Sequence, residues 1–215
     1  MNELKFAELP RHWQRIFELE WESVCKGSKA IAAVITDTDG RILSEGRNRI
    51  GENSIPNPAA AHAETEAVRS LDTAKYPDPH SYILYAGLEP CVMCMGTMVM
   101  GRLRHCEIAA RDLYGGAISL MQHSAFIRDR NVEVRYADTR LGEMQRAFQT
   151  VQTLLFEQNA DKRRRMLTDF AVCHRAGAEA AERLVRDGYF REKQPADYTA
   201  DIIFDTVMHN MAQAL

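Results

Sequence analysis

The sequences AHAE at residues 61–64 and PCVMC at residues 90–94 decide how the rest of the chain is interpreted. A histidine and two cysteines are side chains that zinc prefers as ligands. A catalytic zinc usually has three protein ligands and keeps a fourth position for water. We therefore predict one zinc ion per chain, bound by His62, Cys91 and Cys94.

The spacing of these residues predicts two helix starts that face the same ion. Cys91 and Cys94 are three positions apart, which puts both sulfur atoms on one face of a helical turn. Proline is favoured at the first helical position, so we expect Pro90 to open that helix with both cysteines in its first turn. There the positive end of the helix dipole favours the thiolate, the form that binds metal. His62 and Glu64 are expected at the start of another helix, where side chains lean toward the helix N-terminus.

Charge balance at the predicted zinc explains why a carboxylate is needed beside it. Two thiolates cancel the charge of the ion, so its water is less acidic than at a three-histidine zinc, where the water pKa falls to about 7. Glu64 can take that proton and deliver it to a ring nitrogen, which helps an amine leave as ammonia. Burial is expected to raise the pKa of Glu64, and the metal to lower it.

The composition of the whole chain limits its class. With 215 residues the chain can hold one well-cored domain and an extension, and its composition is that of a globular protein. A net charge of −3 does not indicate a surface that binds nucleic acid. The N-terminal residues do not resemble a signal peptide, and no apolar run is long enough to span a membrane. Five cysteines, two of them assigned to metal, favour a cytoplasmic location.

Hydrophobic patterns predict an α/β fold, a three-layer α/β/α sandwich around a five-stranded mixed sheet. The expected strands are residues 30–36, 41–46, 81–86, 104–110 and 132–136. The expected helices among them are residues 11–25, 61–71, 91–101 and 119–128. We assign residues 1–138 to the zinc-dependent domain and residues 139–215 to a helical C-terminal extension packed on the core or on a partner subunit. The extension is expected to contain helices near residues 141–155, 162–186 and 200–214.

The zinc motif and several further segments resemble the cytidine and deoxycytidylate deaminase superfamily. Its zinc deaminases carry the order H-x-E followed by P-C-x-x-C. Over residues 28–137 the likeness is greatest to the branch with bacterial tRNA adenosine deaminases and guanine deaminases. That likeness is carried by LEPCVMCMG at 88–96, AARD at 109–112 and GGAISL at 115–120. The chain departs from the family in one extra residue between Pro58 and His62, and in a tail that matches neither branch member.

The resemblance implies a cytidine deaminase-like fold, a zinc-dependent deaminase domain at residues 1–138, and a homodimer whose interface shapes the site. It places Asn48 where that branch hydrogen-bonds a purine edge, and it implies that backbone groups near the cysteine helix hold the base. The candidate substrate contacts are Asn48, Ala63, Glu89, Pro90, His123 and Phe126. For Asn48 the alternative is a turn residue that closes a strand, and for His123 and Phe126 it is core packing.

Three functions fit these residues. The first is a hydrolytic deaminase of a free base or nucleoside, purine-like, which the negative net charge and the non-basic tail favour. The second is a tRNA-specific adenosine deaminase that makes inosine, with the basic run at residues 162–165 near tRNA phosphates. That run also fits a solvated helix face. The third is a non-catalytic, zinc-stabilised interaction protein, which would give Glu64 no role.

Overall fold

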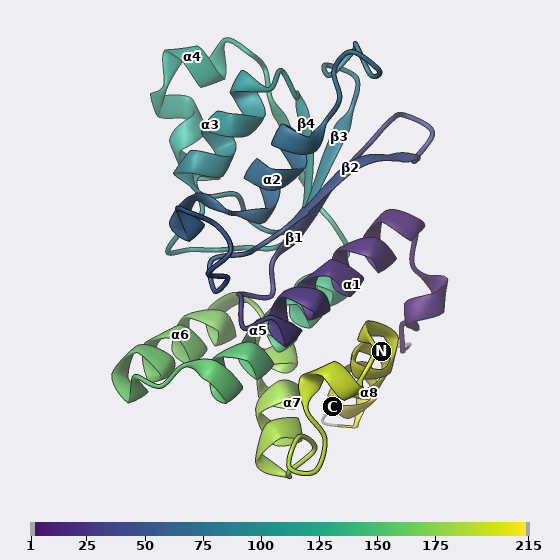
Figure 1. Ribbon diagram of the computed structural model, residues 1–215, viewed down its shortest axis with the longest axis vertical. Coiled ribbons are helices and arrows are strands. Elements are labelled where there is room, and N and C mark those ends of the chain that lie inside the picture. The colour runs from purple at the N-terminus through teal and green to yellow at the C-terminus, as the bar shows by residue number, and fades with distance from the viewer. Residues whose placement is uncertain (1–2, 214–215) are drawn as a thin grey trace.

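Five strands form a single mixed sheet in the computed structural model, which describes residues 3–213 (Figure 1). Their order across the sheet is β2-β1-β3-β4-β5. Their bounds are Ala32–Thr36 (β1), Ile42–Arg47 (β2), Ile83–Leu88 (β3), His105–Ala110 (β4) and Glu133–Tyr136 (β5). β1 is antiparallel to β2 and β3, whereas β3, β4 and β5 run parallel. The predicted five-stranded mixed sheet is confirmed.

The interior strand β1 shows why this segment forms a strand and where the two cores lie. All five of its residues are buried. Because side chains alternate across a strand, Ala32 and Val34 enter one core and Ala33 and Ile35 enter the other. A continuous apolar run of this kind is typical of a strand that is covered on both faces.

Helices cover both faces of the sheet and complete the three layers (Figure 1). On one face pack α2 (Ala63–Ser70) and α3 (Val92–Met100), and on the other pack α1 (Arg11–Cys25) and α5 (Thr139–Phe156). The short α4 (Ala125–Arg128) precedes β5. Four 3₁₀ segments connect these elements, at Phe6–Glu8, Pro58–Ala60, Ile118–His123 and Pro195–Asp197. Within residues 3–213, no helix combines the length and the apolarity needed to cross a bilayer.

The C-terminal part continues from α5 into α6 (Ala160–Cys173), α7 (Arg175–Arg186) and α8 (Ala200–Ala212). α5 lies against the sheet, and its side chains share one core with α1, α7 and α8. The indole nitrogen of Trp21 on α1 donates a hydrogen bond to the carbonyl of Tyr198, at 2.9 Å, which ties the last loop to the first helix. The domain boundary at residue 138 stays a prediction.

Two predicted helices are wrong in detail. The helix expected over residues 162–186 is divided at His174 into α6 and α7, because His174 leaves the helical conformation and its ring contacts the segment after β4. The helix expected over residues 119–128 is a 3₁₀ segment followed by α4, separated at Ser124. The predicted last helix, residues 200–214, ends at Ala212, and residue 214 lies outside the described residues.

One acidic side chain is buried inside the core formed by α1, α5 and the sheet. Glu20 on α1 is fully buried, and neither of its carboxyl oxygens has a hydrogen-bond partner of good geometry. Gly87 on β3 leaves room for it, since a Cβ there would come within 1.9 Å of Glu20 Oε1. Burial raises the pKa of Glu20 well above its usual value. The folded protein therefore keeps this carboxyl protonated under conditions in which the unfolded chain loses the proton.

We expect the Glu20→Gln variant to be more stable than the wild type at pH 8, with a gain that shrinks toward pH 4. The folded state binds the extra proton, so the wild type loses stability as pH rises above the ordinary glutamate value of about 4.3, and the amide does not titrate. Thermal unfolding from pH 4 to 8 measures the effect, and each gain of about 1 kcal/mol should raise Tm by about 2–4 °C.

The exposed Glu192→Gln substitution is the control for this experiment, and it should leave Tm unchanged over the same range. An equal Tm difference between Glu20→Gln and wild type at every pH would show that the buried carboxyl is not protonated in the folded protein.

Candidate active site and metal centre

The two helix starts predicted from the sequence meet at one place, beside the ends of β2 and β3. His62 is the residue that precedes α2 and caps it, and Cys91 holds the same position at α3. Cys94 follows in the first turn of α3 and is fully buried. The predicted position of Pro90 is wrong by two residues: Cys91 is extended (φ −72°, ψ 175°), so the helix begins at Val92 and the proline precedes the cap.

The three donor atoms form a nearly equilateral triangle. Cys91 Sγ lies 3.6 Å from Cys94 Sγ, and His62 Nδ1 lies 3.6 Å from each sulfur. Tetrahedral zinc, with bonds of about 2.3 Å to sulfur and about 2.0 Å to nitrogen, holds its ligand atoms about 3.6–3.8 Å apart. The side chains therefore fit the ion as they stand.

The number of ligands separates a catalytic zinc from a structural one. Among residues 3–213, no fourth histidine, cysteine or carboxylate joins the group formed by His62, Cys91 and Cys94. Cys25, Cys106 and His105 could ligate zinc by residue type, but none belongs to the group. Three protein ligands are typical of catalytic zinc, whereas structural zinc usually has four.

The electrostatics of the triangle favour metal binding. The pKa of the Cys91 thiol is lowered well below its usual value, chiefly by the hydrogen bond between the two sulfur atoms, with a further contribution from His62. A thiolate at this position is the form that coordinates a metal. The contact with Cys91 in turn raises the pKa of His62. A metal ion competes with that proton, so binding releases protons.

Glu64 lies beside the triangle and points toward it. Its side chain is 3% exposed, and its Oε2 is 3.2 Å from Cys94 Sγ. Burial raises the pKa of Glu64, as the sequence analysis expected for the metal-free site. A carboxyl group held next to three metal ligands, in a site too closed to solvate its charge, is suited to exchange a proton with a water at the metal.

A cavity of about 990 Å³ opens above these residues. His62, Glu64 and Cys91 contribute to its floor, and Asn48 lies beside them. Asn48 follows β2 and is 1% exposed; its Oδ1 accepts a hydrogen bond from the amide of Ile50 at 3.2 Å, while its Nδ2 has no partner. The turn geometry that was the alternative for Asn48 is thus present, and its amide donor is still free for a ligand.

Three further predicted substrate contacts lie near the ligands, but they differ in which groups they offer to a substrate. Glu89 lines the cavity, but its carboxylate also accepts hydrogen bonds from the backbone amides of Asp112 and Ile118, so it holds the segment after β4 in place. Ala63 and Pro90 are buried next to the ligands and offer only backbone groups.

His123 and Phe126 are outside the cavity of this chain. Both are exposed, and the Phe126 ring lies 3.3 Å from the guanidinium carbon of Arg130. That they border the base stays a prediction, and their exposure excludes the alternative of core packing.

One wall of the cavity was not predicted from the sequence. It consists of α6 and of single residues from α5 and from the loop before β1: Lys29, Arg146, Gln149, Lys162, Arg165, Met166, Asp169 and Phe170. The basic run was the available signal, because Lys162 and Arg165 are three positions apart and face the same side of a helix. The sequence does not reveal which part of the protein this side of the helix faces, because that depends on packing between distant segments.

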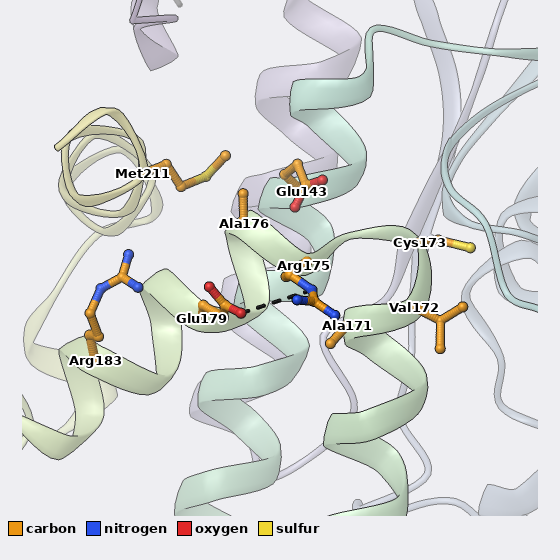
Figure 2. Close-up of a pocket in the computed structure, with 9 residues that line it drawn as sticks. All are labelled: Glu143, Ala171, Val172, Cys173, Arg175, Ala176, Glu179, Arg183 and Met211. Atoms are coloured by element: carbon orange, nitrogen blue, oxygen red, sulfur yellow. Dashed lines mark ion pairs between the residues drawn. The ribbon is translucent and has the colours of Figure 1, made fainter. Parts of the chain in front are cut away.

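A second cavity, of about 680 Å³, lies between α5, α7, α8 and the end of α6. Figure 2 shows its charged side chains, among them Arg175 and Glu179, which form an ion pair at 4.0 Å. Arg183 donates to the carbonyl of Asn210, and the Glu143 carboxylate accepts from the amide of Gly177. These charged groups therefore have partners within the protein. None of the predicted site residues lines this cavity.

Comparison with known proteins places this geometry in a family. Residues 9–157 match the model of the MafB19-like deaminases. The chain is 29% identical over 111 residues to the tRNA-specific adenosine deaminase of Agrobacterium fabrum and 36% identical over 100 residues to that of Aquifex aeolicus. These matches cover 50% and 44% of the chain, and 69% and 62% of the two relatives. The chain thus spans about two-thirds of the length of these relatives.

Among solved structures, a guanine deaminase from Nitrosomonas europaea is similar in fold. It is 23% identical, with a TM-score of 0.51, and the match covers 67% of this chain and 90% of that one. This likeness supports the cytidine deaminase-like fold that was predicted from the zinc motif.

We expect the purified protein to contain close to one zinc ion per chain, and the Cys91→Ser variant to bind it more weakly by at least about 100-fold. Elemental analysis after dialysis against a weak chelator measures the content. Cys25→Ser is the matched control, because Cys25 is exposed and outside the triangle, and it should retain the metal. Equal zinc in the two variants would contradict the assignment of Cys91 as a ligand.

Proposed function

The chain belongs to the MafB19-like deaminase family, and from that premise we propose that it is zinc-dependent and acts on an amino-bearing, purine-like base or nucleoside. The product is the keto form, and ammonia is released. The observation that carries this proposal is the buried carboxyl of Glu64, 3.2 Å from a ligand sulfur, beside three donor atoms that fit zinc. A non-catalytic zinc protein would not need that carboxyl.

The roles of the residues follow from their positions. Zinc, when bound by His62, Cys91 and Cys94, supplies a water that is more acidic than bulk water. Glu64 would accept a proton from a water as its oxygen adds to the amino-bearing ring carbon, and would deliver that proton to the adjacent ring nitrogen. The proton of the added hydroxyl would then move to the amine, the carbon–nitrogen bond would break, and the oxygen would stay as the carbonyl. One water is consumed and one ammonia is released for each base.

Two features of the cavity support a purine-like ring. The free Nδ2 of Asn48 can donate to an acceptor on the base edge, and losing a partner for such a buried donor is costly. The first backbone amides of α2 and α3 have no partner within their helices. The amides near Ala63 and the backbone carbonyls of Glu89 and Pro90 are the candidates for holding the ring, whereas the Glu89 amide already donates to Ala110.

A second candidate function is adenosine deamination in tRNA. The curated relatives named above are tRNA-specific adenosine deaminases, and Lys162 and Arg165 lie at the outer part of the cavity. Lysine and arginine can neutralise phosphates of an RNA loop. The net charge of −3 and the wall formed by α6 favour a small substrate instead.

We also propose that the chain forms a homodimer through the outer face of α3. Val92 and Met100 are 66% and 70% exposed, and Met93 lies between them in the sequence and is exposed as well. Leu120 and Phe126, in the segment before β5, are further exposed apolar side chains. An apolar helix face of this kind is typical of an interface, and the family resemblance implies that a second copy covers it.

The activity is tested by measuring ammonia release from a panel of purine and pyrimidine bases and nucleosides, and inosine formation in a tRNA anticodon stem-loop. We expect turnover on a purine-like small molecule, and a loss of at least about 1,000-fold in Glu64→Gln, which removes the proton carrier but keeps the size of the side chain. Zinc content and Tm of the variant serve as controls.

Two results would contradict the proposal. Turnover on the stem-loop alone would replace the small-molecule substrate by tRNA. Undiminished activity in Glu64→Gln, with zinc retained, would remove the reaction from this site.

For the dimer, we expect the double substitution Val92→Asp/Met100→Asp to raise the dissociation constant by at least about 100-fold, because two charges would be buried in the interface. Light scattering over a concentration series gives the mass. Ile202→Asp on α8 is the control, since Ile202 is also exposed and apolar but lies away from α3. A monomeric wild type would contradict the proposal.

A further inference from the structure

The active-site cavity is lined by four basic side chains from three separate parts of the chain. Lys29 comes from the loop between α1 and β1, Arg146 from α5, and Lys162 and Arg165 from α6. All four line the same cavity as His62 and Glu64. Neither the zinc ligands nor the proton transfer needs them, so their gathering here requires another explanation.

Arg146 is held in a fixed position and keeps an unused donor. The side chain is 4% exposed. Its guanidinium donates to Gln149 Oε1 and, at 2.6 Å, to the carbonyl of Arg111, and its Nε is buried without a partner. The guanidinium also forms an ion pair with Asp112, at 3.8 Å. A buried positive charge with an unpaired donor is costly unless a ligand supplies the missing partner.

Lys29 and Arg165, unlike Arg146, have no acidic partner. Among the described residues, neither has a carboxylate within ion-pair distance, and Lys29 is half-buried. The pKa of Lys29 is lowered, first by burial and then by the nearby charge of Lys162, which shows that the cations are close enough to repel one another. Lys162 itself pairs with Glu157 at 2.6 Å.

The acidic side chains that line the cavity neutralise this group only in part, through the ion pair between Asp112 and Arg146. Glu64 lies at the ligand triangle, and Glu89 is occupied by backbone amides. Asp112 accepts from the amides of Tyr114 and Gly115, and Asp169 is exposed. A divalent anion placed among the four basic side chains would complete the charge balance.

We propose that this cation group binds the phosphate of the substrate, so that the enzyme deaminates a nucleoside monophosphate whose base reaches Asn48 and Glu64. The inference rests on the proposed function, because it places the base at the same catalytic floor. A cavity of about 990 Å³ is at the upper end of the range for small-molecule sites, about 300–1,000 Å³, and is much larger than one base needs. The wall formed by α6 favours a single nucleotide over a polynucleotide as the source of the phosphate.

The proposal is tested by comparing kcat/KM for a nucleoside and for its 5′-monophosphate, with the base that the substrate panel identifies. We expect the wild type to prefer the monophosphate by about 10- to 100-fold, the usual effect of hydrogen bonds to a charged group. In Lys29→Gln and Arg165→Gln the ratio of the two kcat/KM values should fall by a similar factor.

Arg164→Gln is the matched control. Arg164 lies on the same helix, pairs with Asp161 at 2.8 Å and does not line the cavity, so its removal should leave the ratio unchanged. Calorimetric binding of the monophosphate to Glu64→Gln, with and without Lys29→Gln, gives a readout that does not depend on turnover, and the second substitution should weaken binding by about 10-fold or more.

The possible outcomes distinguish this proposal from the one on which it rests. If ammonia is released but the nucleoside and its monophosphate react equally, the phosphate site is wrong and the deaminase function stands. If only the RNA stem-loop reacts, and Lys29→Gln and Arg165→Gln reduce that activity, the phosphate belongs to nucleic acid and the mononucleotide is excluded. If no base, nucleoside, nucleotide or stem-loop releases ammonia, the proposed function itself fails.

Discussion

The structure depends on one geometric constraint: three side chains from two helix starts must bring their donor atoms to within 3.6 Å of one another. This requires α2 and α3 to begin at the same level above the sheet. Gly46 on β2 makes the approach of α2 possible, since a Cβ there would lie 2.2 Å from the carbonyl oxygen of Ala63 and 2.4 Å from the amide nitrogen of Ala67. The level of α3 is set by β3, which leads into it and is hydrogen-bonded on both sides, to β1 and β4. The position of the metal ligands is therefore a consequence of close helix-to-sheet packing rather than of the motif alone.

A second set of contacts ties the C-terminal helices to this centre. The carbonyl of Arg111, just after β4, accepts from Arg146 on α5, and its amide donates to His174 Nε2 at 3.1 Å. Because Nε2 accepts, a neutral His174 carries its proton on Nδ1, which faces the Glu143 carboxylate at 3.8 Å. Gly142 allows this packing, since a Cβ would come within 2.5 Å of the His174 ring. The junction between α6 and α7 is thus held by the same segment that Glu89 fixes on its other side, and α6 is kept over the cavity.

These contacts explain which features could be predicted from the sequence. The zinc ligands and the five strands are encoded locally, by ligand spacing and by continuous apolar runs, so both could be inferred from single segments. The position of Pro90 could not, because proline suits several places at a helix start and only the extended backbone of Cys91 decides between them. The break at His174 and the wall formed by α6 depend on contacts with residues more than 60 positions away, such as that between His174 and Arg111. From the sequence, residues 162–165 fit a solvent-exposed helix face as well as a cavity wall, because helical periodicity does not show which part of the protein the basic face contacts.

The charged groups that line the cavity differ in what they attract. Two thiolates would cancel the charge of a zinc ion, so the metal centre would attract a phosphate less strongly than a three-histidine zinc would. Glu64 adds an acidic group beside the metal ligands, whereas the four basic side chains come from other elements that line the same cavity. An anionic group is therefore drawn to the basic side chains, and a neutral ring with an amino group is left to lie near Asn48 and Glu64. A cysteine-rich zinc site and a cation group in one cavity act together, because the zinc site does not compete for the negative charge that the cations bind.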